Sequence, residues 1–105
     1  MDGSSVGIRT RTVEGDGVTL HVVSAGRTDA PTIVLVHGYP DTHACFEHVI
    51  PRLASRFHVV AYDVRGAGRS TAPATSAGYL MSHLHADLRA VIDAMSGGRP
   101  VHLVG

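Results

Sequence analysis

The sequence contains no lysine, and all nine basic residues among its 105 are arginines. This absence excludes chemistry that depends on lysine, such as a Schiff base or the lysine of a phosphate-binding loop. The chain also lacks net charge, with a formal value of +0 at pH 7. Because it offers no basic field to a polyanion and no polybasic run to an anionic lipid surface, we expect neither nucleic acid nor membrane as a partner.

Cysteine is almost as scarce. Cys45 is the single cysteine, so an internal disulfide is excluded and a small buried side chain is expected. The first ten residues include an acidic side chain and no long apolar run, which predicts neither a signal peptide nor a transmembrane helix. We therefore expect a cytoplasmic protein. Hydrophobic residues make up 44% of the chain, which is typical of one globular domain, with residues 1–6 as a flexible tail.

Two short runs rich in β-branched residues open the chain, at residues 8–13 and 18–25. The Asp16-Gly17 pair between them is a strong signal for a tight turn. The sequence therefore predicts an antiparallel hairpin at the start of the fold.

After the hairpin, apolar runs of strand length alternate with helical patterns. A fully apolar run suits a strand that is covered on both faces, as in a parallel sheet. The predicted elements are strands at 32–36, 57–62 and from 101, and helices at 44–56, divided by Pro51, and at about 79–95. This order predicts an α/β fold with right-handed βαβ units.

The loops then separate the α/β families. Gly66-Ala67-Gly68 lacks the third glycine of a dinucleotide fingerprint and does not open a helix, so nucleotide binding is not expected. The segment His37-Gly38-Tyr39-Pro40 follows a buried strand and can form a turn that directs backbone N–H groups at one point. Such donors stabilise an oxyanion, with removal of one costing about 2.7–4 kcal/mol. The pattern favours hydrolase chemistry, with the Tyr39 amide as the donor.

The stretches "VLVHGYP" and "FHVVAYDVRGAGRS" resemble the N-terminal part of α/β-hydrolase fold proteins, and the His-Gly-x-Pro form is similar to the epoxide hydrolase and haloalkane dehalogenase branch. The resemblance runs from about Val18 to Gly105. It also resembles epoxide hydrolase-like domains that are fused to a short-chain dehydrogenase. The fold implied is an opening antiparallel hairpin followed by parallel βαβ units that stop at the nucleophile elbow.

The resemblance also assigns roles to residues. Tyr39 is implied to donate its backbone N–H to the oxyanion hole, with His37, Gly38 and Pro40 supporting the turn. Members of the second loop, similar to the family's Asp-x-Arg-Gly-x-Gly-x-Ser segment, are implied to be structural; they are Asp63, Arg65, Gly66, Gly68 and Ser70.

The nucleophile, Asp in epoxide hydrolases or Ser in esterases, is implied to stand two residues after Gly105, with the acid and the base later still. The 105 residues alone are therefore expected to be inactive, and a fused or complementary C-terminal part is the expected partner, with a small-molecule substrate for the whole. No cofactor is expected. The alternatives are a serine esterase or haloalkane dehalogenase-like hydrolase, or a non-catalytic binding module that needs a second chain.

Other residues could substitute for the missing groups, and each has a simpler interpretation. Ser70 lies in a Gly-x-Ser-x-small pattern but well past its strand, so a loop hydrogen bond is expected rather than a nucleophile elbow. His37 could act as a base but is expected to pack and hydrogen-bond beneath the turn. Asp63 is expected to bind loop amides. The pairs His43/His48 and His83/His85 lack clustered thiol or carboxylate partners, so no metal site is expected.

Overall fold

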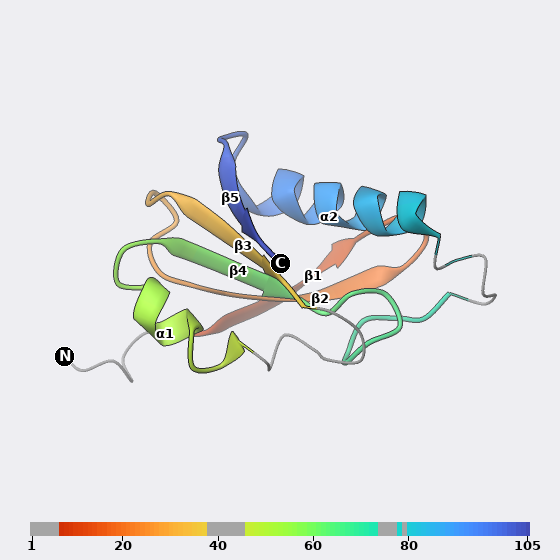
Figure 1. Ribbon diagram of the computed structural model, residues 1–105, viewed down its shortest axis with the longest axis horizontal. Coiled ribbons are helices and arrows are strands. Elements are labelled where there is room, and N and C mark those ends of the chain that lie inside the picture. Colours follow the sequence, from red (N-terminus) through yellow and green to blue (C-terminus); the bar gives the residue numbers. More distant parts are fainter. Residues whose placement is uncertain (1–6, 38–45, 74–77, 79) are drawn as a thin grey trace.

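The computed structural model describes residues 7–37, 46–73, 78 and 80–105, and in this part of the chain five strands form one mixed sheet in the order β1-β2-β4-β3-β5 (Figure 1). The strands are β1 (Arg9–Glu14), β2 (Thr19–Ala25), β3 (Thr32–Val36), β4 (His58–Tyr62) and β5 (Val101–Val104). Each boundary lies within about one residue of the predicted one. The predicted tail, residues 1–6, lies outside the described residues.

β1 and β2 form the predicted antiparallel hairpin, with Arg9 opposite Ser24 and Glu14 opposite Thr19. The turn between them is closed by the N–H of Gly15, which donates to the carbonyl of Val18 over 2.8 Å. Gly17 has a φ of +79°, a conformation that glycine adopts without steric cost. The tight turn predicted at Asp16-Gly17 is confirmed.

The other strand pairs define the crossovers. β2 runs antiparallel to β4, whereas β3 runs parallel to both β4 and β5. The chain therefore steps from β3 to one side, returns across β3, and continues to β5 on the other side. The last strand pairs with β3 from Thr32 opposite Val101 to Leu35 opposite Val104.

Helices cover both faces of this sheet. Helix α2 (Met81–Met95) lies on one face and the short helix α1 (Ile50–Leu53) on the other (Figure 1). The expected division of the 44–56 segment at Pro51 is confirmed, because α1 is a short helix of four residues with Pro51 in its first turn. The expected helical length is wrong in the described part, where residues 46–49 and 54–56 are not α-helical. Proline has no N–H to donate to a preceding turn, so it begins this helix instead of continuing one.

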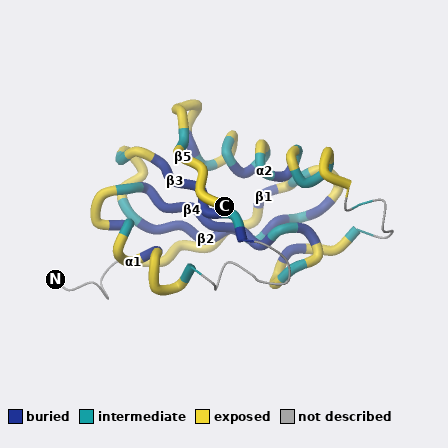
Figure 2. Tube along the Cα trace, viewed as in Figure 1, coloured by how far each residue is buried: buried dark blue, intermediate teal, exposed yellow. Residues whose placement is uncertain are grey.

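Alternation along the strands divides the core into two clusters. Val22, Val34 and Val60 face α2 and pack with Val91, while residues such as Leu35 and Val59 pack on the opposite face with Ile50 of α1. Full burial of a valine or leucine side chain contributes about 1.5–3 kcal/mol. The three inner strands are dark in Figure 2 because both of their faces are covered.

β5 is different from the inner strands. Its side chains Leu103 and Val104 are 54% and 48% exposed, although they are apolar, and the strand forms one edge of the sheet (Figure 2). An exposed apolar edge strand favours pairing with a further strand. Among the described residues, no helix has the length and apolar character needed to cross a lipid bilayer.

Candidate active-site edge

The ends of β3 and β4 meet at one edge of the sheet, where the hydrolase interpretation expects a site. Gly38, Tyr39 and Pro40 follow β3 directly but lie outside the described residues. The orientation of the Tyr39 amide therefore stays a prediction. The surrounding framework is described: His37, the loop after β4, and the first turns of α2.

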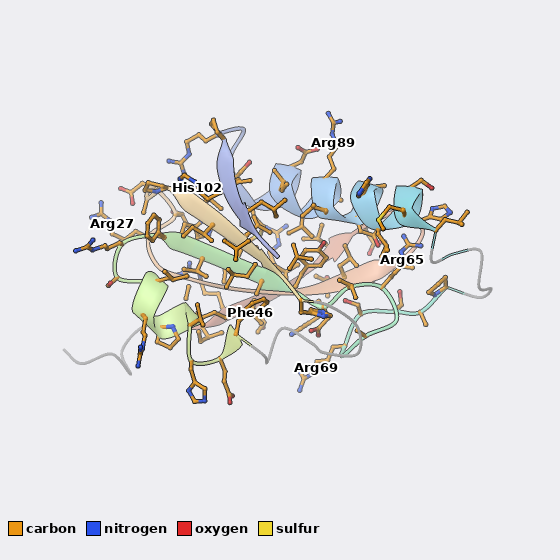
Figure 3. The ribbon with its side chains drawn as sticks, in the orientation of Figure 1. Arg27, Phe46, Arg65, Arg69, Arg89 and His102 are labelled. Carbon is orange, nitrogen blue, oxygen red and sulfur yellow. The ribbon has the colours of Figure 1, made fainter. Side chains whose placement is uncertain are left out.

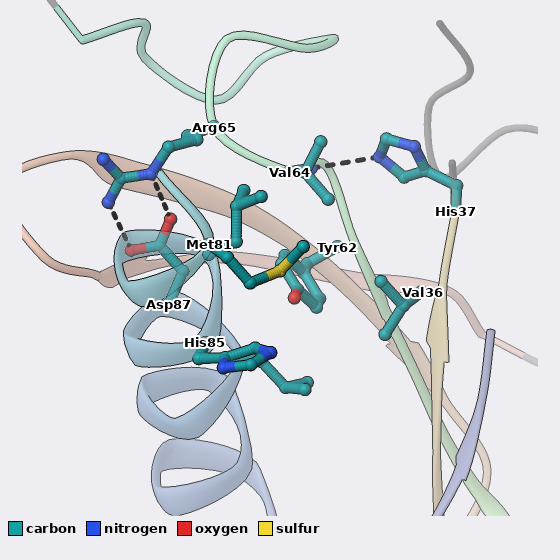
Figure 4. A pocket seen from close by; sticks show the side chains of 10 residues that line it. Val36, His37, Tyr62, Val64, Arg65, Met81, His85 and Asp87 are labelled. Carbon is teal, nitrogen blue, oxygen red and sulfur yellow. Dashed lines mark hydrogen bonds and ion pairs between the residues drawn. The ribbon is translucent and has the colours of Figure 1, made fainter. Parts of the chain in front are cut away.

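His37 joins the two strand ends. Its side chain is buried, and its Nε2 accepts a hydrogen bond from the backbone N–H of Val64 over 3.0 Å (Figure 4). An imidazole nitrogen that accepts carries no hydrogen, so the neutral ring holds its proton on Nδ1. The geometry agrees with a positioning role beneath the turn, because the nitrogen needed by a general base is already occupied at Nε2.

Asp63 organises the loop after β4. Its Oδ2 accepts from the backbone N–H of Arg69 over 3.0 Å, as expected for a carboxylate that binds loop amides. Gly68 has a φ of +50°, and a Cβ built there would lie 2.3 Å from Oδ2 of Asp63. Only glycine allows the loop to approach the carboxylate this closely.

Ser70 is fixed by two hydrogen bonds. Its hydroxyl donates to the carbonyl of Asp63 and accepts from the N–H of His21, the latter over 2.8 Å. The residue is buried in a loop and does not stand on a strand–turn–helix elbow. The prediction of a loop hydrogen bond is confirmed.

Arg65 is buried and ion-paired. Its Nε and Nη2 donate to the two carboxylate oxygens of Asp87 over 2.7 and 2.8 Å (Figure 4). Further bonds run from Nη1 to the carbonyl of Gly78 over 2.6 Å and from Nη2 to the carbonyl of Asp16 over 2.8 Å. The Asp87 carboxylate also accepts from the N–H of Asp16 over 2.8 Å. One guanidinium thus ties the hairpin turn, the loop after β4 and α2 together.

Asp87 is a member of this buried cluster that the sequence analysis did not single out. The signal was present, since Asp87 stands three residues after Leu84 and four before Val91, both members of the apolar stripe. A charged residue on such a stripe needs a buried partner. Nearby, Nδ1 of His83 lies 2.6 Å from Oδ2 of Asp16, which adds a second link between the helix and the hairpin turn.

A cavity of about 350 Å³ opens between α2 and the ends of β3 and β4 (Figure 4). Its lining is mainly apolar and includes Val36, Tyr62, Val64, Met81, Leu84 and Leu88, with His37 and His85 among the polar members. Burial, followed by the charge of Asp87, raises the pKa of Tyr62 to about 12, so its phenol stays neutral at physiological pH.

Metal ligation has no basis in the described part of the chain, where no three His, Cys, Asp or Glu side chains are grouped closely enough to hold an ion. Cys45 and His43 lie outside the described residues. The described edge is therefore a framework of amides, a buried ion pair and an apolar cavity.

An antiparallel hairpin of β1 and β2 followed by parallel strands in the order β4-β3-β5, with helices on both faces, is the arrangement of the N-terminal portion of an α/β-hydrolase fold. Residues 31–105 match the sequence pattern of the family described as alpha/beta hydrolase fold. The chain belongs to this family.

Similar proteins are named epoxide hydrolases in several organisms. The chain is 40% identical over 92 residues to epoxide hydrolase A of Mycobacterium tuberculosis, covering 87% of this chain and 29% of that protein. It is 48% identical over 89 residues to a probable oxidoreductase, EphD, of the same organism, covering 85% of this chain and 15% of that protein.

Solved structures of epoxide hydrolases also match the chain. Epoxide hydrolase VrEH1 of Vigna radiata matches with a TM-score of 0.85 at 36% identity, over 91% of this chain and 31% of that one. Epoxide hydrolase A of Mycobacterium thermoresistibile matches with a TM-score of 0.85 at 37% identity, over 92% of this chain and 30% of that one. The chain thus spans less than a third of the length of each of these relatives.

Proposed function

We propose that this chain is the N-terminal part of an epoxide-opening hydrolase, and that its turn His37-Gly38-Tyr39-Pro40 supplies the oxyanion hole. The observation that carries the proposal is the match of fold and sequence to epoxide hydrolases, with a TM-score of 0.85 at 36–37% identity. The framework at the sheet edge supports it, because His37 and the Asp63 loop hold the strand ends from which the turn departs.

In the proposed reaction, an aspartate attacks an epoxide carbon, the carbon–oxygen bond breaks, the released oxygen takes up a proton, and an ester forms between enzyme and substrate. Water activated by a histidine then attacks the ester carbonyl, and the Tyr39 amide donates to the oxyanion that develops there. Collapse of this intermediate breaks the ester bond, releases the diol and restores the aspartate. Loss of one such donor costs about 2.7–4 kcal/mol of transition-state stabilisation. The aspartate and the histidine would belong to a complementary C-terminal part.

Two surfaces of the chain support such a partner. The exposed edge strand β5 can accept a further parallel strand. A connection from β5 to that strand, to be right-handed, would cross the sheet on the face that already carries α2. A helix in that connection would lie beside α2 and cover the apolar cavity. We therefore assign the cavity to a packing helix of the complementary part and not to the substrate.

Complementation tests the proposal. The chain is mixed with the C-terminal part of Mycobacterium tuberculosis epoxide hydrolase A, beginning after the residues that match Gly105, and hydrolysis of a small aryl epoxide is followed. Tyr39→Phe retains the amide and should retain activity. Tyr39→Pro removes the amide and should reduce kcat about 10²–10³-fold, in the range seen for loss of one oxyanion donor. Gel filtration of each mixture reports assembly separately from catalysis.

The alternatives need different tests. The mixture does not separate an epoxide hydrolase from a serine esterase or a haloalkane dehalogenase-like hydrolase, because the added part supplies the nucleophile. A binding module would assemble with the partner and show no turnover. The reading frame after the codon of Gly105 is a second discriminator: His-Asp-Trp-Gly indicates an epoxide hydrolase and x-Ser-x-Gly a serine hydrolase.

The relative named a probable oxidoreductase favours one refinement. The chain covers 15% of that protein and 29% of epoxide hydrolase A over similar lengths, so the former is the longer of the two. Because the present residues carry no dinucleotide fingerprint, we propose that any oxidoreductase function resides in a separate domain of such a longer protein.

A further inference from the structure

A second groove lies away from the strand ends just described. It has a volume of about 360 Å³ and is lined by Arg9 and Arg11 of β1, Ser24 of β2, Thr28, His58 of β4, and the last residues of α2. It lies at the opposite end of β4 from the candidate active-site edge, since His58 is the first residue of that strand and Tyr62 the last. The hydrolase proposal makes no use of it.

His58 has an unsatisfied ring nitrogen. The residue is 2% exposed, its Nδ1 lies 3.1 Å from the Thr32 hydroxyl, and its Nε2 is buried with no hydrogen-bond partner in the described structure. Burial lowers the pKa of His58, and the charges of Arg9 and Arg99 lower it further, so the ring is neutral. A buried polar atom without a partner is uncommon, and here the residue that carries it lines the groove.

The charges at the groove decide what would satisfy this nitrogen. No carboxylate is among the residues that line it. Arg9 is anchored there, because its Nη2 donates to the carbonyl of Gly26 over 2.7 Å. The C-terminal end of α2 carries a partial negative charge of roughly half a unit, which is smaller than the two full charges of Arg9 and Arg11. A cation would be repelled, whereas an anion would be attracted.

From this geometry we infer that the groove binds a small oxyanion, a phosphate or a carboxylate group, between the guanidinium groups of Arg9 and Arg11 and the Nε2–H of His58. The inference requires the tautomer in which the Thr32 hydroxyl donates to Nδ1 over 3.1 Å, since the ring hydrogen then stands on Nε2 and that atom becomes a donor. Guanidinium groups bind both kinds of oxyanion through paired, charge-assisted hydrogen bonds.

Nuclear magnetic resonance of the ¹⁵N-histidine-labelled chain tests the inference directly. Potassium phosphate and potassium acetate are titrated separately at constant ionic strength, against potassium chloride, and the signals of His58 are assigned by their loss in His58→Phe. We expect the Nε2–H tautomer and a saturable shift of the His58 nitrogens with phosphate or acetate but not with chloride. Comparison of the two titrations identifies the preferred oxyanion.

Matched arginine variants complete the test. Arg9→Gln and Arg11→Gln should each weaken binding about tenfold, in keeping with the loss of a charge-assisted hydrogen bond. Arg89→Gln should leave it unchanged, because Arg89 points away from the sheet on α2 and is exposed (Figure 3). Far-UV circular dichroism verifies each fold, and the wild-type titration alone decides if a variant does not fold.

Four results would overturn the inference: no shift of His58, an equal shift with chloride, equal weakening in Arg89→Gln, or the ring hydrogen on Nδ1. The first would mean that the groove binds neither anion, the second and third that the salts act by general screening, and the fourth that Nε2 has no hydrogen to donate.

Discussion

Removing the charge of Asp87 should strongly destabilise the chain. Asp87→Asn replaces one of the two oxygens that accept from Arg65 with an NH₂ group, so donor faces donor in a site where the two side chains are 1% and 2% exposed. Breaking a buried ion pair by removal of one partner costs about 3–5 kcal/mol. We expect a loss of this size in the free energy of unfolding.

The measurement is urea-induced unfolding followed by far-UV circular dichroism. Asp93→Asn is the matched control, because it makes the same substitution on the same helix at an exposed pair with Arg89, whose atoms lie 4.0 Å apart. It should cost at most about 0.5 kcal/mol. If Asp87→Asn falls within about 1 kcal/mol of this control, the ion pair does not hold the three segments together.

A double-mutant cycle gives the coupling itself. Arg65→Leu and Asp87→Leu should each be strongly destabilising, because each leaves an unpaired buried charge, whereas the double variant removes both charges. We expect a coupling free energy of about 2 kcal/mol or more between the two sites. If the losses of stability in the two single variants add up to the loss in the double variant, the two charges do not stabilise each other, and the side chains contribute only by filling space.

Three further outcomes are expected. Gly68→Ala should lower the free energy of unfolding by at least about 1 kcal/mol more than Gly98→Ala, measured in urea, because both have positive φ but only the first would force a Cβ against Asp63. The lowered pKa of His58 means that the unfolded chain binds a proton more readily, so stability should fall as pH drops below the ordinary value of 6.5, and His58→Phe should flatten this part of a urea-midpoint profile. Leu103→Glu should reduce self-association in light scattering, because it places a charge on the exposed edge strand; unchanged association would assign it to another surface.

The strands were the most predictable part of the molecule. Thr32–Val36 and His58–Tyr62 are apolar runs of strand length, and the Asp16-Gly17 turn fixes the hairpin, so local pattern suffices for them. The segment expected to be helical over 44–56 has a short helix with Pro51 in its first turn as predicted, but the α-helix covers only Ile50–Leu53. Before it, in the described part, the N–H of Val49 donates to the carbonyl of Phe46 over 2.9 Å, which closes a turn and not an α-helix.

Long-range contacts were less predictable. The composition of the loop after β4, rich in Gly, Ser and Thr, predicts exposed residues. Three of its residues are nevertheless buried, namely Asp63, Arg65 and Ser70. Their burial depends on partners such as His21 and Asp87, which are far away in the sequence. No local pattern records such pairs. The role of Tyr39 follows from family resemblance and stays a prediction.

The strand order has a consequence for synthesis. The hairpin and β4 with β3 are complete before β5 is made, and β5 then adds to the outer side of β3. The margin of the sheet opposite the hairpin thus passes from β3 to β5 as translation proceeds. Until something covers Leu103 and Val104, a nascent chain would present that margin to chaperones and to other copies of itself.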